Sequence, residues 1–370
     1  MMKTFRILLS VIVLFTGIAS FPYMGHAVSA RGAILMEQES GRVLFEKNAH
    51  TPMRIASITK IMTAILAIES GKLDEYVTVS EKAYRTEGSS IYIQPGDKIK
   101  LIDLTYGLML RSGNDAAVAI AEHVGGDLEN FVTLMNKKAK QIGMKNTTFA
   151  NPHGLDDHEN HYSTAYDMAL LTRYAMNNKD YAKISSTKSY TCKSLDRAMN
   201  TWLNKNKLLN MYPYSTGGKT GYTKRAKRTL VSTAEKEKLK LIAVTINDRN
   251  DWQDHMALFN QAFNQYEAVK IIDKEKQINY LSVIFGKVVP KRDIIYPLKK
   301  GERQEISISI SVDSDLKERE DFKKPIGKVK ISLKDELIGE SPLILVEPFE
   351  TSEKEDKDWW EKIKSKLNIN

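Results

Sequence analysis

Ser57 and Lys60 stand three residues apart at the start of a strongly apolar helical pattern. Residues at positions i and i+3 share one face of a helix, so the serine hydroxyl and the lysine amine can meet there. A serine becomes a nucleophile when a nearby base takes its proton, and a desolvated lysine can be that base. The free N–H groups at a helix start also favour an alkoxide or an oxyanion. Alone the pair predicts little, because an N-capping serine with an exposed lysine gives the same spacing.

Two further motifs strengthen this interpretation. Ser112-Gly113-Asn114 falls on a loop between two helical segments, and Lys219-Thr220-Gly221 comes immediately before a predicted strand. At average residue usage, a Lys-Thr-Gly triplet is expected about 0.1 times in a chain of this length. The three motifs in this order form the S-x-x-K, S-x-N and K-T-G set of the active-site serine enzymes that recognise penicillin.

With these motifs the chain resembles the D-alanyl-D-alanine carboxypeptidases, the low-molecular-mass penicillin-binding proteins that trim peptidoglycan stem peptides. Longer sequence segments, three of them around the motifs, match that family as well: Ile55–Thr63, Leu110–Ala117, Asn151–Leu155 and Lys219–Thr223. The resemblance implies a serine carboxypeptidase that removes the terminal D-alanine from stem pentapeptides and so limits cross-linking. It also implies covalent inhibition by β-lactam antibiotics, and no cofactor or metal.

The resemblance implies a role for each matched residue. Ser57 attacks the carbonyl carbon between the two terminal D-alanines, and Lys60 takes its proton. Ser112 bridges protons between Lys60 and Lys219, and Asn114 holds an amide of the substrate.

The third motif implies the remaining contacts. Thr220, with Lys219 and Gly221 beside it, binds the terminal carboxylate of the substrate. The backbone N–H groups of Ser57 and Tyr222 form the oxyanion hole, a preorganised pair of donors that lowers the barrier. Arg249 follows a predicted strand and is either a further carboxylate partner or a plain surface arginine.

Three alternatives stay open. A cluster of His153, Asp156, Asp157, His158 and His161 suggests a zinc D,D-peptidase, although the last two histidines are spaced i and i+3 on a loop rather than as H-E-x-x-H on a helix. A class A β-lactamase shares the nucleophile, but it carries S-D-N and uses a glutamate-activated water. A non-catalytic wall-binding scaffold is the third alternative.

Composition limits the class of protein. The chain has 370 residues, of which 42% are hydrophobic and 27% charged, as is ordinary for a folded globular protein. The length allows two or three domains. Cys192 is the one cysteine, which excludes an internal disulfide framework and a cysteine metal cage. The net charge of +9 favours an acidic partner without choosing one.

The first thirty residues form a predicted signal peptide. Lys3 and Arg6 make a short basic region, and the apolar run from Ile7 to Ala19 is too short to span a bilayer comfortably. Small residues then allow cleavage after Ala27 or after Ala30, with an uncleaved anchor as the alternative. Export argues against nucleic acid as the target of the positive charge.

Residues 31–268 are predicted to form an α+β catalytic domain of the penicillin-binding-protein and serine β-lactamase type. A hairpin is expected at Ala33–Met36 and Arg42–Phe45, and helices at Ile58–Leu66, Leu101–Met109 and Ala116–Val124. Paired strands at Thr229–Ala234 and Leu239–Ile246 precede a helix at Met256–Phe263. This order of elements indicates helices packed on an antiparallel sheet.

Residues 274–348 predict a small all-β domain, because Ile306–Val312 alternates strictly and the runs Leu281–Val289, Gly327–Leu333 and Leu343–Val346 are strand-like. Residues 351–370 contain a charged linker and an amphipathic helix with Trp359, Trp360, Ile363 and Leu367 on its apolar face. Such a helix suits the outer face of the cytoplasmic membrane, where paired tryptophans are common. The alternative is a helix that docks on the β domain.

Two segments depart from the broader family. Lys224–Arg228 holds four positive charges in five residues, which is either a solvated hairpin turn or a site that attracts an anionic wall polymer. Together with Asp156–Tyr162, this turn resembles the sporulation-type carboxypeptidases that modify cortex peptidoglycan.

Overall fold

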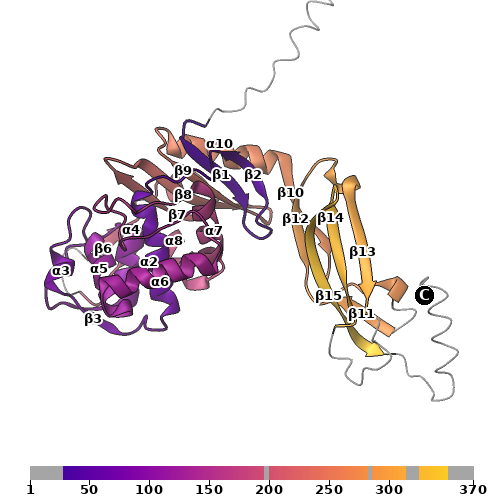
Figure 1. Ribbon diagram of the computed structural model, residues 1–370, viewed down its shortest axis with the longest axis horizontal. Coiled ribbons are helices and arrows are strands. Elements are labelled where there is room, and N and C mark those ends of the chain that lie inside the picture. The colour runs from indigo at the N-terminus through magenta and orange to yellow at the C-terminus, as the bar shows by residue number, and fades with distance from the viewer. Residues whose placement is uncertain (1–27, 196–199, 282–285, 314–324, 349–370) are drawn as a thin grey trace, which may run out of the picture.

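The computed structural model describes residues 28–195, 200–281, 286–313 and 325–348. An α+β domain forms one end of the molecule and a narrow β domain extends from it (Figure 1). The signal segment before residue 28 and the predicted anchor at 351–370 lie outside the described residues. Within those residues, no helix has both the length and the apolar character that crossing a membrane requires.

An antiparallel sheet of five strands forms the centre of the α+β domain. Its strands stand in the order β2-β1-β9-β8-β7. Their bounds are Gly32–Glu37 (β1), Val43–Lys47 (β2), Ser215–Thr223 (β7), Lys227–Lys236 (β8) and Leu239–Ile246 (β9). All side chains of β1 and most of β9 are buried, because helices cover both faces of the sheet. The helix α10 (Asp251–Gln265) covers one face, where Leu258 and Phe259 pack against the sheet.

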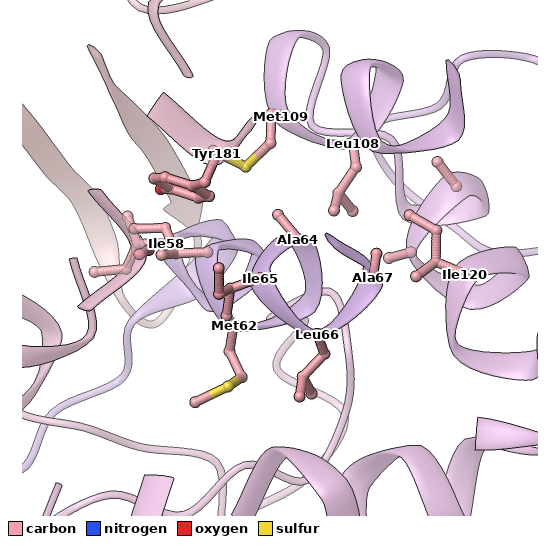
Figure 2. Packing of buried hydrophobic residues seen from close by; sticks show 14 of the residues in the cluster. Ile58, Met62, Ala64, Ile65, Leu66, Ala67, Leu108, Met109, Ile120 and Tyr181 are labelled. Carbon is pink, nitrogen blue, oxygen red and sulfur yellow. The ribbon is translucent and has the colours of Figure 1, made fainter. Parts of the chain in front are cut away.

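The other face carries the helices that hold the catalytic motifs. At their centre lies α2 (Lys60–Glu69), which begins where the 3₁₀ turn η1 (Ala56–Thr59) ends. In Figure 2, Leu108, Ile120 and Tyr181 from neighbouring elements lie around α2, and nine of its ten residues are buried. A helix that is apolar all round in this way is a core helix. It therefore gives Ser57 and Lys60 a rigid base.

The remaining helices surround α2. Their bounds are Glu81–Tyr84 (α3), Leu101–Leu110 (α4), Asn114–Gly125 (α5), Leu128–Gln141 (α6), Ala165–Met176 (α7), Lys179–Ser186 (α8) and Leu208–Met211 (α9). Two small strand pairs lie among them: Tyr76–Thr78 (β3) with Lys98–Lys100 (β4), and Ser189–Thr191 (β5) with Thr201–Leu203 (β6).

The β domain begins earlier than residue 274. Strand β10 (Tyr266–Ile272) pairs with β12 (Ile294–Lys299), so it belongs to this domain and follows directly from α10. The sequence analysis missed β12. A second sheet has the order β11-β15-β14-β13, with bounds Gly286–Pro290, Glu336–Pro348, Gly327–Leu333 and Ile306–Val312, and the short 3₁₀ turn η2 covers Glu302–Glu305.

One arginine joins the two domains. Arg42, in the turn between β1 and β2, donates to both carboxylate oxygens of Glu302, at 2.8 and 2.7 Å, and to the carbonyl oxygen of Pro297 at 2.6 Å. Its guanidinium also lies 5.3 Å from the ring centroids of Tyr266 and Tyr296. A half-buried, bidentate arginine between two aromatic rings fixes orientation better than a single exposed ion pair does.

Most of the expected elements of the first domain are present. The hairpin, the helices around the motifs, the paired strands and the terminal helix occur at the predicted positions. Lys219-Thr220-Gly221 precedes the predicted strand, now β8, but it lies inside a strand of its own, β7, which the sequence pattern did not indicate.

Candidate active site

The nucleophile candidate Ser57 lies in the 3₁₀ turn η1, directly before α2. Ala56 before it has a positive φ of 50°, an unusual backbone conformation for a residue with a side chain. Ile58 after it is fully buried and anchors the turn in the core. The hydroxyl of Ser57 is therefore held at the wall of a cleft, and the helix behind it holds Lys60.

Lys60 is fully buried, and its amine has three partners. Its Nζ lies 3.0 Å from Ser57 Oγ, 2.7 Å from Asn114 Oδ1 and 2.6 Å from the carbonyl oxygen of His153. The oxygens of Asn114 and His153 only accept, whereas the Ser57 hydroxyl can also donate. A neutral amine has two N–H bonds and one lone pair. In the neutral form, the two N–H bonds would go to these carbonyl oxygens and the lone pair would face the serine proton.

The surroundings of Lys60 favour this neutral form. Burial lowers the pKa of Lys60 well below its usual value of 10.5, because desolvation disfavours the ammonium, and the nearby charges of Lys219 and Lys205 lower it further. Asp115 opposes the shift. A lysine with a depressed pKa beside a serine hydroxyl is a suitable general base.

Asn114 is held from both ends of its amide. It is the first residue of α5, and its Oδ1 accepts from Lys60 while its Nδ2 donates to the carbonyl oxygen of Glu87 at 2.6 Å. Its backbone N–H donates to the carbonyl oxygen of Ser89, also at 2.6 Å. The resemblance implied that Asn114 binds the substrate, but in this geometry the side chain positions the Lys60 amine.

Asp115, which the sequence analysis did not single out, supports the same loop. Its buried carboxylate accepts from the Ser90 hydroxyl at 2.5 Å and from the backbone N–H of Ile91 at about 3 Å. These bonds fix residues 89–93 against the start of α5. The segment Ser112–Ala116 therefore contains a structural aspartate, Asp115, next to the candidate site residues Ser112 and Asn114.

Ser112 and Lys219 form a second buried pair. Ser112 has a positive φ of 65° between α4 and α5, a strained position of the kind found at functional sites. Lys219 Nζ lies 3.0 Å from Ser112 Oγ and 2.8 Å from the carbonyl oxygen of Thr220. Burial lowers the pKa of Lys219 to about 7, and the charge of Lys205 adds to the shift. The implied proton bridge is in place on the Lys219 side only, since no hydrogen bond joins Ser112 to Lys60 within the described residues.

Strand β7 brings Gly221 against the nucleophile. A Cβ atom at this position would lie 2.9 Å from the Ser57 nitrogen and 2.4 Å from Thr229 Oγ1. Thr229 in turn donates to the carbonyl oxygen of Ile55 at 3.0 Å, which ties β8 to the turn that carries Ser57. Only glycine allows this close approach, which sets β7 at Gly221 against the backbone nitrogens of Ser57 and Ile58.

A cleft of about 350 Å³ lies over these groups. The motif residues Ser57, Ser112, Thr220, Gly221 and Tyr222 line it, together with Ser89, Lys205, Lys207, Arg228, Asp251 and Trp252. Tyr222 is exposed at its edge. The lining holds three basic side chains, Lys205, Lys207 and Arg228, and one acid, Asp251, so the cleft attracts an anionic ligand.

Arg228, rather than Arg249, lies in the cleft where a further partner for the substrate carboxylate was expected. Arg249 lines a separate hollow with Ser29 and Asn247 and is not among the residues that line the cleft, which favours the alternative of a plain surface arginine. Arg228 lies opposite Tyr222 in the β7–β8 register, and Asp251 holds its guanidinium through two bonds of 3.0 and 2.6 Å. The face that Arg228 shares with Tyr222 is set by the pairing of β8 with β7, which alternation along one strand does not reveal.

The histidine cluster braces the loop beside Lys60. His161 Nδ1 accepts from the backbone N–H of Ala150 at 3.0 Å, so its proton sits on Nε2 and points at Thr59 Oγ1, 2.8 Å away. Burial lowers the pKa of His161 to about 4, and burial with the Lys60 charge lowers that of His153 to about 3. Among the described residues, no three of the histidines, cysteines and acids converge as a metal site.

The positive charge of the turn Lys224–Arg228, which follows the Lys219-Thr220-Gly221 motif, is partly neutralised by acidic side chains. Arg225 donates to both carboxylate oxygens of Glu159, at 2.6 and 2.9 Å, and Glu159 also accepts from Arg54 at 2.8 Å. The backbone N–H of Arg225 donates to Asp156. The two segments that resemble the sporulation type therefore bind each other.

Comparisons with known proteins agree with this geometry. A family model of D-alanyl-D-alanine carboxypeptidases matches residues 19–250, and a model of the penicillin-binding protein 5 C-terminal domain matches residues 266–350. Penicillin binding protein 5 from Haemophilus influenzae superposes with a TM-score of 0.71 and 28% identity, covering 87% of this chain and 98% of that one. The fold is therefore that of the low-molecular-mass penicillin-binding proteins.

Curated relatives narrow the class. D-alanyl-D-alanine carboxypeptidase DacF of Bacillus subtilis is 35% identical over 339 residues, which cover 86% of this chain and 85% of the relative. D-alanyl-D-alanine carboxypeptidase DacC of Escherichia coli is 33% identical over 352 residues, covering 88% and 85%. The chain belongs to the D-alanyl-D-alanine carboxypeptidase family and is a serine-type peptidase of the hydrolase class.

Proposed function

We propose that Ser57 cleaves the D-alanyl-D-alanine bond of peptidoglycan stem peptides through a covalent acyl-enzyme. The observation that carries this proposal is the arrangement of Lys60, whose two carbonyl acceptors leave its lone pair for the Ser57 hydroxyl. Ser57 Oγ attacks the carbonyl carbon of the penultimate D-alanine while its proton moves to Lys60. The backbone N–H groups of Ser57 and Tyr222 stabilise the oxyanion.

The second buried pair serves the leaving group. The C–N bond breaks, terminal D-alanine leaves with a proton on its amine, and the acyl group stays on Ser57. Ser112 Oγ lies in the cleft and has Lys219 behind it at 3.0 Å, so this hydroxyl can deliver the proton and regain one from the ammonium. Water then attacks the ester: its hydroxyl stays on the acyl carbon, its proton passes through Ser112 to Lys219, and Lys60 returns its proton to Ser57 Oγ as the ester C–O bond breaks. The stem peptide leaves as a carboxylic acid, which loses its proton to solvent.

The basic side of the cleft selects the substrate. The terminal carboxylate of the stem peptide binds near Thr220, where Lys219 supplies positive charge and Arg228 is a bidentate donor. A β-lactam carries a carboxylate and a reactive carbonyl and occupies the same cleft. The cleft lining described here contains no glutamate, and its one acid, Asp251, is engaged by Arg228, which favours a long-lived penicilloyl ester over β-lactamase turnover.

The location that we propose for the enzyme follows from the residue patterns of its two terminal segments. The enzyme is exported through the signal peptide of residues 1–30 and held at the outer face of the cytoplasmic membrane by Trp359, Trp360, Ile363 and Leu367. Both ideas rest on the amino-acid pattern. The contact of Arg225 with Glu159 supports a shared specialisation of the two segments, and spore-cortex peptidoglycan is the substrate we propose for it.

Labelling with a fluorescent penicillin tests the mechanism. The wild-type protein should carry a stable covalent label that EDTA does not change, and Ser57→Ala should carry none. Lys60→Met keeps an unbranched side chain but removes the amine, so it should acylate at least about 100-fold more slowly, with Tm as the check on folding. Release of D-alanine from a pentapeptide then confirms hydrolysis. An EDTA-sensitive activity, or rapid loss of the label, would refute the serine acyl-enzyme or the carboxypeptidase assignment respectively.

A further inference from the structure

Two adjoining hollows lie at one end of the central sheet, outside the cleft. The larger has a volume of about 480 Å³ and the smaller of about 260 Å³, and Arg31 and Asn247 line both of them. We call them the paired hollows. Among the described residues, their lining contains no acid but five cations: Arg31, Lys47, Arg54, Arg225 and Arg249. Such a surface attracts an anionic ligand.

The topology of the sheet brings these cations together. Arg31 directly precedes β1, Lys47 ends β2 and Asn247 directly follows β9, and the order β2-β1-β9 sets these strand ends side by side. The N–H of Arg31 donates to the carbonyl oxygen of Asn247 at 3.1 Å, and its carbonyl oxygen accepts from Asn48 Nδ2 at 2.9 Å. A rigid backbone therefore carries the Arg31 side chain.

Two arginines of the larger hollow have no counterion. Arg31 and Arg249 are exposed, and within the described ranges neither side chain forms a hydrogen bond or an ion pair. Lys47 beside them donates to the carbonyl oxygen of Val28 at 2.7 Å, which leaves its charge in place. A guanidinium group carries donors only and binds a carboxylate through two parallel hydrogen bonds. The larger hollow is therefore suited to a carboxylate.

Acids near the paired hollows offset this charge only in part. At the smaller hollow, Glu159 binds both Arg54 and Arg225, at 2.8 and 2.6 Å. Next to the larger hollow, Asp248 and Asp254 bind a serine of its lining, and each is only 1% exposed. None of these three acids is part of the lining, so the uncompensated charge lies mainly on the arginines of the larger hollow.

A single turn connects the paired hollows to the cleft. At the junction of β7 and β8, Arg225 lines the smaller hollow and Arg228 lines the cleft. The carbonyl oxygen of Arg228 also accepts from the N–H of Asp248 at 3.1 Å, which ties this junction to the segment after β9. A polymer with one stem peptide in the cleft therefore brings further stem peptides close to the paired hollows.

We propose that the paired hollows are a second anion site, which binds the terminal carboxylate of a neighbouring stem peptide in the same peptidoglycan polymer. Arg31 and Arg249 are its main donors. The site rests on the function proposed above, because the cleft must hold the first stem peptide. It favours the polymer over free peptides as substrate, since a free pentapeptide has one terminal carboxylate and the cleft binds it.

Sedimentation of the enzyme with insoluble peptidoglycan tests the ligand. A fluorescent penicillin first fills the cleft covalently, so the remaining binding reports surfaces outside it. The labelled enzyme should sediment with peptidoglycan from which acid has removed all phosphate polymers. Amidation of the peptidoglycan carboxylates should weaken this binding at least about 10-fold. Binding that requires the phosphate polymers, or that amidation leaves unchanged, would overturn the carboxylate site.

A double variant tests the residues. Arg31→Gln with Arg249→Gln should weaken the binding of the labelled enzyme at least about 5-fold and raise the apparent KM for D-alanine release from peptidoglycan, while the KM for a free pentapeptide stays unchanged. Lys145→Gln with Arg303→Gln removes the same charge at exposed positions elsewhere and should change none of these values.

The outcomes separate this site from the catalytic proposal. Equal losses in the two double variants would reduce the effect to net charge and overturn the site. A raised KM for the free pentapeptide in the Arg31 and Arg249 variant would place these arginines at the cleft and also overturn it. A labelled wild-type enzyme that does not sediment would refute the paired hollows alone, whereas an enzyme that takes no label would refute the acyl-enzyme and the second site with it.

Discussion

Exchange of Asn114 for aspartate distinguishes the two roles of this residue. The resemblance to known carboxypeptidases places Asn114 on the substrate, whereas the structure places its Oδ1 2.7 Å from the Lys60 amine. Asn114→Asp keeps the shape of the side chain and puts a negative charge at that distance. If the structural role is correct, the change acts on the proton affinity of Lys60.

The size of the effect follows from the distance. At an effective dielectric constant of about 20, two unit charges separated by the Lys60–Asn114 contact attract by roughly 6 kcal/mol. Burial of the new carboxylate opposes its ionisation by several kcal/mol, and the lost donor to Glu87 costs about 1–3 kcal/mol of stability. A net gain of about 3 kcal/mol for the charged pair raises the pKa of Lys60 by roughly 2 units.

The sign of the rate effect is fixed by the mechanism. Acylation needs the neutral amine, so the rate rises with pH as Lys60 loses its proton. A higher pKa of Lys60 moves this rise of the acylation rate, the acidic limb of the pH profile, to higher pH by about 2 units. At a pH below the limb, the acylation rate of the variant is about 100-fold lower than that of the wild type. Above the shifted limb, the variant regains much of the wild-type rate.

Second-order acylation by a penicillin between pH 5 and pH 10 is the assay, with Tm measured on each sample. Asn136→Asp is a matched control, because Asn136 also binds backbone groups through both ends of its amide, yet it lies on α6 away from the cleft. It should lower Tm and leave the limb in place. A uniform loss of rate in Asn114→Asp, with the limb unmoved and KM raised, would refute the positioning role and restore the substrate role.

Three further predictions concern the cleft and its support. Gly221→Ala should reduce kcat at least about 10-fold in a D-alanine release assay, because the added Cβ meets the Ser57 nitrogen at 2.9 Å; an unchanged kcat would contradict the close approach. Arg228→Gln should raise KM about 10-fold or more while Arg249→Gln leaves it unchanged, and equal effects would contradict the placement of the carboxylate. Burial depresses the pKa of His161 from 6.5 to about 4, so its contribution to stability, at most about 3 kcal/mol, is complete above pH 6.5 and is lost as pH falls toward 4. His161→Gln should flatten the dependence of Tm on pH in that window, and an unchanged slope would show that His161 does not titrate there.

Local spacing was enough to predict the first catalytic pair. Ser57 and Lys60 lie on one helical turn, so their contact depends on backbone geometry that three residues fix by themselves. The hairpin, the apolar helix and the alternating strand at 306–312 are likewise patterns of period 2 or 3.6 that the chain displays directly.

Contacts between distant segments were beyond local spacing. Lys219 meets Ser112 because the sheet edge at β7 is packed on the loop before α5, and no periodicity relates the two segments. Arg249 and Arg228 look alike as basic residues near a strand end, yet one lies in the hollow beside Ser29 and the other in the cleft. The pairing of β8 with β7 decides between them, since it sets Arg228 opposite Tyr222.

The amino-acid sequence by itself predicted the class of chemistry, the contact between Ser57 and Lys60, and the division into an α+β and a β domain, because motifs and periodic patterns are local properties. The tertiary structure alone decided the depressed pKa of Lys60, the partner of Asn114 and the place of Arg228 in the cleft. These depend on desolvation and on the direction of hydrogen bonds, which exist only after segments far apart in the chain have packed together.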